Sequence, residues 1–168
     1  MKISLRKFNE SDIPNKVKWI NDSANNRFLH YDLPLTEEKT AIWYEKIKDS
    51  DTRYDAVIEV DGEPVGLLGL LSIDRKNKKA EYYISMGNTS FKGCGVATEA
   101  LRLLLEYAFC ELGLNRVYSY TETENIPAQR HLEKHGFLRE GCTLQDVFSR
   151  GKFVDRYIYG LTKDGWKK

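Results

Sequence analysis

The stretch from Glu81 to Leu101 joins a β-rich segment to a helical one through two glycines. Its first part, Glu81 to Met86, is rich in aromatic and β-branched residues, as strands are. Gly93 and Gly95 follow, and glycine permits backbone conformations and close approaches that other residues avoid. A helix beginning near Val96 would leave the N–H groups of its first turn unpaired, and such groups bind anions. The junction therefore predicts a pyrophosphate site.

Two common phosphate-binding loops do not match this junction. No G-x-x-x-x-G-K-[ST] occurs, which argues against a P-loop nucleotidase. The G-x-G-x-x-G fingerprint of dinucleotide-binding folds has Thr98 in place of its third glycine. In those folds the loop also follows the first strand, whereas here it comes after about half of the chain.

The segment Lys92 to Ala97 has the form K-x-x-G-x-A and is followed by Thr-Glu-Ala. It resembles the Q/R-x-x-G-x-G/A loop of the GNAT superfamily of acetyl-CoA-dependent N-acyltransferases, with Lys92 in place of the usual Arg, Gln or Trp. The segments 3–6, 125–137 and 160–166 are also similar to one branch of that superfamily. This branch contains the ribosomal-protein N-terminal, polyamine and amino-sugar acetyltransferases. The resemblance covers nearly the whole chain.

The spacing of apolar residues and turn residues predicts the secondary structure. We expect strands at 3–8, 53–60, 64–73, 80–86, 117–121, 143–148 and 153–161, and helices from 10 to about 22, from 37, from 96 to 112 and from 126 to 135. Thr36 is expected to cap the second helix, with Ile42, Trp43 and Ile47 on its apolar side. These patterns indicate an α+β protein with an antiparallel-rich sheet. The resemblance implies the GNAT fold, with a central mixed, mostly antiparallel sheet of about seven strands, and we expect one domain over residues 1–168.

The resemblance implies acetyl-CoA as the co-substrate and assigns its contacts. Backbone N–H groups of the glycine loop would hold the pyrophosphate, the end of the preceding strand would pair with the pantetheine arm, and the N–H of Met86 would polarise the thioester carbonyl. Asn125 would contact the cofactor arm, cap the following helix, or do both, while Arg130 would reach a phosphate or stay solvated. The expected cofactor-binding residues are Ile84, Met86, Lys92, Gly93, Cys94, Gly95, Val96, Ala97, Thr98, Asn125 and Arg130.

Acetylation of an amine requires a base, because an alkylammonium with a pKa near ~10 is almost wholly protonated at neutral pH. Glu81 is our candidate, since many relatives carry a carboxylate at the start of this strand. The alternative is a solvent-facing glutamate beside lysines 78 and 79. His131 and His135 are weaker candidates, because a basic residue near a helix C-terminus is favoured by the helix dipole alone. Where many GNAT enzymes carry a tyrosine proposed to reprotonate the thiolate, this chain has Leu132, so Tyr120, Ser119 or water would have to take that role if an acid is needed.

Acceptor-binding residues are expected in the loop from Asn25 to Pro34, which contains Arg27, His30 and Tyr31, and in the turn from Ser149 to Lys152. The acceptor class stays open. A small molecule such as an amino sugar, an amino-sugar nucleotide or a polyamine is one reading, and a protein N-terminus is the alternative. A further alternative is an acyl-CoA-binding module without turnover.

The overall composition argues against polyanion partners. Twenty-six basic and 25 acidic residues give a formal net charge of +1, so nucleic acid and membrane binding are not expected. The N-terminus lacks the apolar region of a signal peptide, and we expect a cytoplasmic protein. Three cysteines without C-x-x-C spacing predict reduced thiols rather than disulfides or a zinc site, so no metal is expected. Exposed final strands often pair between subunits in this fold, so a homodimer is possible.

Overall fold

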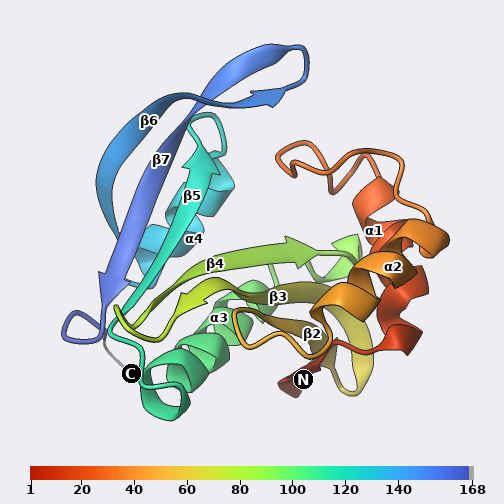
Figure 1. Ribbon diagram of the computed structural model, residues 1–168, viewed down its shortest axis with the longest axis horizontal. Coiled ribbons are helices and arrows are strands. Elements are labelled where there is room, and N and C mark those ends of the chain that lie inside the picture. Colours follow the sequence, from red (N-terminus) through yellow and green to blue (C-terminus); the bar gives the residue numbers. More distant parts are fainter. Residues whose placement is uncertain (167–168) are drawn as a thin grey trace.

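A mixed sheet of seven strands runs through the molecule in the order β1-β2-β3-β4-β5-β7-β6 (Figure 1). The strands are β1 (Ile3–Lys7), β2 (Tyr54–Val60), β3 (Glu63–Asp74), β4 (Lys79–Met86), β5 (Arg116–Glu122), β6 (Leu138–Ser149) and β7 (Lys152–Thr162). The β4–β5 pair is parallel, and the other neighbouring pairs are antiparallel. The computed structural model describes residues 1–166, so the last two residues of the expected domain lie outside the described part. The predicted mixed, mostly antiparallel α+β fold is confirmed.

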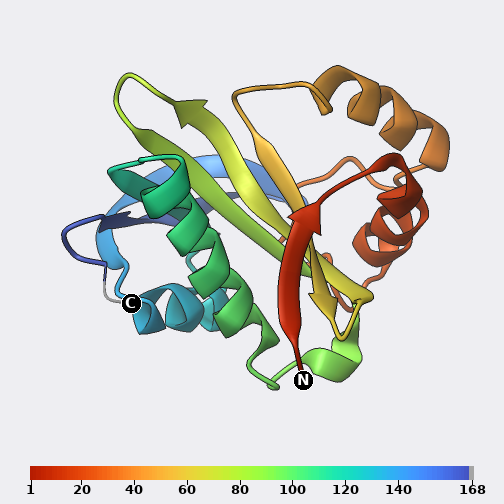
Figure 2. The ribbon, with the colours of Figure 1, turned by 90° about the horizontal axis from the view of Figure 1, so that it is seen from below.

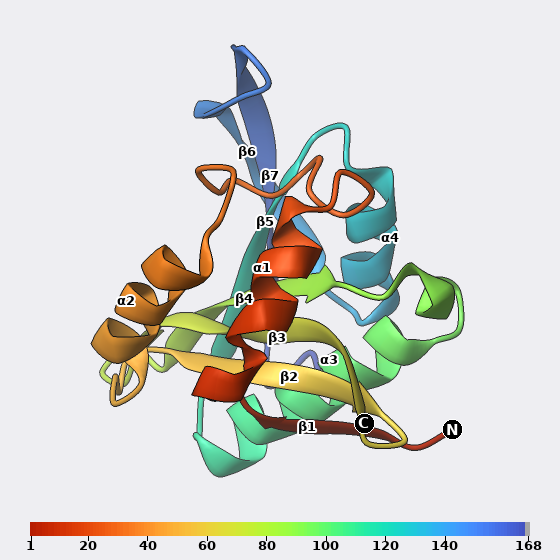
Figure 3. The same ribbon diagram turned by 90° about the vertical axis from the view of Figure 1, so that its right-hand side faces the viewer.

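In the described residues 1–166, four α-helices cover the sheet, two on each face. Helices α1 (Ile13–Asn21) and α2 (Glu37–Ile47) lie on one face, and α3 (Val96–Glu106) and α4 (Ile126–Lys134) on the other. Figure 2 shows α3 lying over one face of the sheet, and Figure 3 shows α1 in front of β2 and β3 with α3 behind them. None of the described helices is long and apolar enough to cross a membrane.

The alternation of side chains in β2 explains why both faces of the sheet are covered. Ala56 and Ile58 are fully buried on the α3 side, whereas Val57 is fully buried with Trp19 on the α1 side. Successive residues of a strand point to opposite faces, so β2 contributes to two apolar clusters. Fully burying a valine or leucine side chain contributes about 1.5–3 kcal/mol, and these clusters hold the strands in place.

Helix α3 begins at the predicted glycine junction. Gly95 is its N-cap residue, with a φ of 80°, a left-handed conformation that favours glycine. Ala100, Leu101 and Leu104 are fully buried along one face, as the sequence spacing predicts. The helix continues through a π-helical turn (Tyr107–Glu111), and Gly113, with a φ of 67°, follows its end.

Two expectations about exposed positions were wrong. Ile42 is 53% exposed, and the inner side of α2 is formed by Thr40, Ala41 and Trp43 instead. Strand β6 begins five residues earlier than the expected 143–148, because its mostly exposed residues carry no apolar alternation and its pairing with β7 alone defines it. The predicted cap at Thr36 is confirmed, since its hydroxyl accepts a hydrogen bond from the Lys39 N–H over 3.1 Å.

Strands β4 and β5 are paired over a short distance only. Their register includes Lys79 with Arg116, Ala80 with Val117, and Glu81 with Tyr118, and it ends there. Beyond this point the two strands part, as Figure 1 shows. The sheet is therefore split beside the C-terminal half of β4.

Candidate active site

A cavity of about 640 Å³ lies where β4 and β5 separate. Its lining contains residues from both faces of the sheet. Tyr82, Ile84 and Ser119 contribute from the α3 and α4 side, whereas Glu81 and Tyr83 contribute from the α1 and α2 side, as strand alternation requires. The cavity therefore passes from one face of the sheet to the other.

Part of the cavity wall is unpaired strand backbone. The N–H of Gly87 donates to the carbonyl of Val65 in the β3 region, so by alternation Ser85 and Tyr83 direct their peptide groups to β3. Tyr82, Ile84 and Met86 then direct theirs toward β5. The Ser119 hydroxyl donates to the Tyr82 carbonyl over 2.9 Å. Among the described residues no β5 backbone group pairs with Ile84 or Met86, so these two can accept an added strand-like ligand.

The predicted anion cradle follows Lys92, which lines the cavity, whereas residues 93–98 themselves lie outside its lining. Gly93 and Gly95 have φ values of 78° and 80°, and a Cβ at either position would meet no atom within 4 Å. No side chain caps α3, and the first backbone hydrogen bond of the helix runs from the Glu99 N–H to the Gly95 carbonyl over 3.1 Å. The N–H groups of Val96, Ala97 and Thr98 therefore point out of the helix end without a helical partner. This arrangement suits an anion.

The side chains of the glycine loop and its flanks differ in burial and in contacts. Val96 is buried in the main apolar cluster, so its backbone alone faces outward. Cys94 is exposed, and its thiol lies 3.9 Å from the carbonyl oxygen of Ser90 and 3.8 Å from that of Lys92. Lys92 lines the cavity, and its ammonium group donates to the carbonyl of Ala24 over 3.3 Å. This hydrogen bond connects the glycine loop to the segment 22–36 between α1 and α2, called here the first long loop.

Helix α4 borders the cavity on the same face. The side chain of Asn125 caps it by accepting from the Ala128 N–H over 3.3 Å, and both residues line the cavity. Leu132, which stands where many GNAT enzymes carry a tyrosine, is 2% exposed and contributes an apolar side chain to the cavity wall. Arg130 is exposed and lies outside the cavity lining.

The two histidines of α4 have structural contacts that the sequence did not indicate. His131 lies 3.0 Å from the Tyr82 hydroxyl, and burial together with the charges of His135 and Lys134 lowers the pKa of His131 to about 4. Burial therefore disfavours a positive charge on His131, although the nearby helix C-terminus favours one. The ring of His135 donates to the carbonyl of Thr98 over 3.0 Å and ties α4 to the first turn of α3.

Glu81 lies on the cavity wall, on the α1 and α2 face. Among the described residues it has no hydrogen bond and no ion pair, although the neighbouring lysines 78 and 79 were the alternative partners. Burial raises the pKa of its carboxyl group, and the charge of Arg156 partly opposes this. A half-buried carboxylate without a counter-ion is the arrangement expected of a proton acceptor.

A buried carboxylate holds the first long loop over the cavity. Glu122 is 3% exposed and lies 2.8 Å from the His30 ring, while the Arg150 guanidinium binds it from the β6–β7 turn. Burial would raise the pKa of Glu122, but the hydrogen bonds from Arg150 and His30 outweigh it and lower the pKa. Arg150 also donates to the carbonyl of Arg27. The two predicted acceptor segments therefore meet through this carboxylate.

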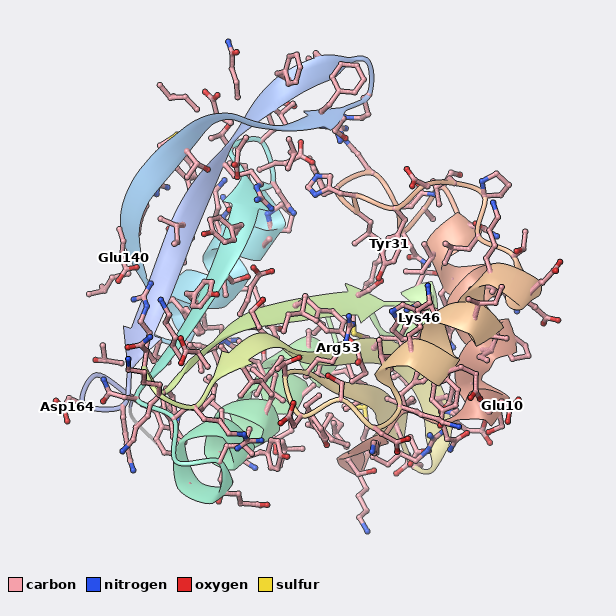
Figure 4. The ribbon with its side chains drawn as sticks, viewed as in Figure 1. Glu10, Tyr31, Lys46, Arg53, Glu140 and Asp164 are labelled. Carbon is pink, nitrogen blue, oxygen red and sulfur yellow. The ribbon has the colours of Figure 1, made fainter. Side chains whose placement is uncertain are left out.

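The predicted residues Arg27, His30 and Tyr31 all line the cavity. The side chain of Arg27 is 66% exposed and lies 3.8 Å from Glu124, whereas Tyr31 reaches from the loop toward β4 and Arg53 (Figure 4). Arg53 itself was missed, as were Tyr83 and Arg156. The signal for Tyr83 was present in the sequence, because alternate residues of a strand share a face with Glu81. Arg53, which directly precedes β2, and Arg156 in β7 carried no such signal.

The split sheet, the uncapped helix and the cavity between them define an acyltransferase-type site, and the comparisons with known proteins agree. The family described as the Acetyltransferase (GNAT) domain matches residues 2–138. The chain belongs to this family of enzymes, whose co-substrate is acetyl-CoA.

Named relatives give the range of activities in the family. The chain is 29% identical over 136 residues, 81% of its length and 75% of the relative's, to the SPbeta prophage-derived uncharacterized N-acetyltransferase YokL of Bacillus subtilis. It is 32% identical over 110 residues, 66% of its length and 59% of the relative's, to spermidine N(1)-acetyltransferase of Escherichia coli. The spermidine N-acetyltransferase of Vibrio cholerae, solved with CoA and spermine, shares the fold with a TM-score of 0.91 at 21% identity, over 97% of this chain and 96% of that one.

Proposed function

We propose that this protein transfers an acetyl group from acetyl-CoA to a primary amine of a small molecule by direct attack of the amine. One observation carries the proposal. A single cavity extends from Lys92, just before the glycine loop and the uncapped N-terminus of α3, through the split in the sheet to the unpaired carboxylate of Glu81 on the other face. A thioester bound from the first side and an amine bound from the second side would meet at the split between β4 and β5.

The cofactor side is built mostly from backbone. The N–H groups from Gly93 to Thr98 would hold the pyrophosphate, and the unpaired peptide groups of Ile84 and Met86 would bind the pantetheine arm as an added strand does. Acetyl-CoA, when bound, supplies the activated acetyl group. The Met86 N–H, which points into the split, would donate to the thioester oxygen as negative charge develops there.

The acceptor side supplies the base. Glu81 would take a proton from the incoming ammonium group, directly or through water, and leave the neutral amine as the nucleophile. Its raised pKa makes it a better proton acceptor than an exposed glutamate. The rings of Tyr83 and Tyr120 lie on the same face and would exclude water from the amine.

A general acid at the usual tyrosine position is absent, because Leu132 occupies it. Tyr120 and Ser119, the hydroxyl-bearing alternatives that the sequence offers, both line the cavity. A thiolate with a pKa of about 8.5 leaves without much assistance, so either hydroxyl or water would be sufficient to protonate it.

The test of this function is thiol release from acetyl-CoA with a panel of amines that includes spermidine, amino sugars and a peptide with a free N-terminus. We expect acceptor-dependent release with at least one small amine, together with an increase in melting temperature on adding acetyl-CoA alone. Acetyl-CoA binding without thiol release for any amine would favour the non-catalytic alternative. Preference for the peptide would favour protein N-terminal acetylation.

We also propose that the protein forms a homodimer through the final strands. The support is that β6 is an edge of the sheet and exposes Leu138, Leu144 and Phe148 by 64% or more. Light scattering after size-exclusion chromatography tests this, and a monomer at high concentration would contradict it.

A further inference from the structure

The acceptor half of the cavity contains few free negative charges. Two carboxylates line the cavity, Glu81 and Glu122. The Glu122 carboxylate is already bound by Arg150 and His30. Among the described residues of the lining, Glu81 is therefore the carboxylate that is free to meet an ammonium group. A polyamine bound with one nitrogen at Glu81 would find no second carboxylate on this wall for its other nitrogens.

The opposite end of the acceptor half presents a cation. Arg53 lines the cavity with a side chain that is 26% exposed, and its Nε and Nη2 donate to Asp55 over 2.8 and 2.9 Å. Its Nη1 has no hydrogen bond among the described residues. Asp55 also accepts from the Tyr83 hydroxyl and is 6% exposed, so it cannot turn toward a ligand. The unbonded edge of the Arg53 guanidinium is therefore the charged group available at this end.

A second cation behind Arg53 makes this end positive. Lys16 is 7% exposed, and its ammonium group lies 3.4 Å from the centre of the Trp43 ring and 5.7 Å from that of Tyr31. Burial lowers the pKa of Lys16 to about 8, so most of the molecules still carry this charge at neutral pH. Two cations share the single carboxylate of Asp55, which disfavours a further ammonium group and favours an anion.

We propose that the acceptor is an amine that also carries an anionic group, such as a carboxylate or phosphate, and that Arg53 binds this group and determines specificity. The inference rests on the proposed function, since it deepens the acceptor side of the same site. It separates this protein from its spermidine-acetylating relatives, whose acceptor carries only positive charges.

The positions of the two charged residues set the size of such a molecule. Leu71 in β3 pairs with Glu81 in β4, and continuing the β2–β3 register places Arg53 opposite Leu71 from the other side. Neighbouring strands are about 4.8 Å apart, so the Cα atoms of Glu81 and Arg53 are about 10 Å apart with both side chains on one face. The amine and the anionic group would therefore be separated by a few carbon atoms.

Matched acceptors test the inference. Thiol release from acetyl-CoA would be measured with 4-aminobutanoate and 6-aminohexanoate and with the diamines of the same chain lengths. Butylamine and hexylamine, which carry no second charged group, serve as the neutral references. Charge-assisted hydrogen bonds are about twice as strong as neutral ones, so we expect kcat/KM for the better amino acid to exceed that of its diamine by about tenfold or more. A preference for the diamine at both lengths would overturn the inference.

The variant must not leave Asp55 unpaired in the protein interior. The double variant Arg53→Gln/Asp55→Asn removes both charges and keeps an acceptor for the Tyr83 hydroxyl. We expect it to lose most of the preference for the amino acid, and Arg53→Lys to keep part of it. Arg102→Gln, on the exposed face of α3, removes one positive charge outside the cavity and should leave the preference unchanged. An unchanged preference in a double variant of normal melting temperature would also overturn the inference.

A binding measurement separates this inference from the proposed function. Calorimetric titration of the CoA-bound protein with 6-aminohexanoate and with 1,6-diaminohexane requires no turnover. If no amine releases thiol but 6-aminohexanoate binds and depends on Arg53, the proposed function fails and the ligand class stands. If amines are acetylated but 6-aminohexanoate binds no better than the diamine, the function stands and this inference fails.

Discussion

Replacing Glu81 by glutamine tests the acid–base assignment most directly. The amide keeps the shape of the side chain but cannot accept a proton, and no described residue loses a hydrogen bond or ion pair by the change. An alkylamine with a pKa of about 10.4 is neutral in about one molecule per thousand near pH 7.4. The variant would depend on this fraction, so we expect kcat/KM at neutral pH to fall by about 10²- to 10⁴-fold, or about 2.7–5.4 kcal/mol.

The pH profile distinguishes a base from a structural residue. In the wild type, activity should fall as Glu81 becomes protonated, at a pH above the usual glutamate range because burial raises its pKa. In Glu81→Gln the fall in activity that protonation of Glu81 causes at low pH should be absent. The activity of the variant should instead rise by up to about tenfold per pH unit until the pKa of the amine is reached. The assay is initial-rate thiol release from pH 6 to 10.

Stability gives a second readout for the same variant. A raised carboxyl pKa in the folded state means that the charged form is less favourable there than in the unfolded chain, so Glu81 destabilises the fold above that pKa. Glu81→Gln should therefore keep or raise the melting temperature. Glu63→Gln, at an exposed position of β3, is the matched control and should change neither property. A pH profile parallel to the wild type, or a lower melting temperature, would refute the assignment of Glu81 as the base.

Three further predictions concern the other parts of the site. Gly95→Asp should abolish the rise in melting temperature caused by acetyl-CoA, because it places a side chain and a negative charge at a left-handed position in the anion cradle. A folded variant with an unchanged rise would contradict the assignment of this loop as the pyrophosphate site. Arg27→Ala and Tyr31→Ala should each raise the KM of the acceptor several-fold with little effect on acetyl-CoA affinity, measured by steady-state kinetics; unchanged acceptor KM values in both would contradict the position of the acceptor. His131 titrates near 6.5 when unfolded and at about 4 when folded, so it should cost about 3 kcal/mol of stability as the pH falls between these values. Denaturant unfolding should show this loss in the wild type and not in His131→Gln.

Much of the fold could be predicted from the sequence because it depends on local patterns. The strand, glycine pair and helix from Glu81 to Leu101 were located within one or two residues, since apolar spacing and glycine conformations are properties of neighbouring residues. Strand β6 was placed too late, because its exposed residues carry no apolar alternation. Ile42 was placed on the wrong side of α2, because an exposed isoleucine looks the same in sequence as a buried one.

The sequence by itself determined the cofactor side of this protein, and the tertiary structure decided the acceptor side. The anion cradle is a continuous segment, so its residues and their order are sufficient to indicate it. The acceptor wall is assembled from Arg53, which precedes β2, from β3, β4, β5 and β7, and from the first long loop. Whether a charge on that wall is free or paired depends on contacts between residues far apart in the chain, such as His30 with Glu122, which are 92 positions apart. The contacts of His30 and Arg150 with Glu122 leave Glu81 as the unpaired carboxylate of the described lining, and the pairing of β2 with β3 and of β3 with β4 places Arg53 on the same face as Glu81. No local pattern records either result.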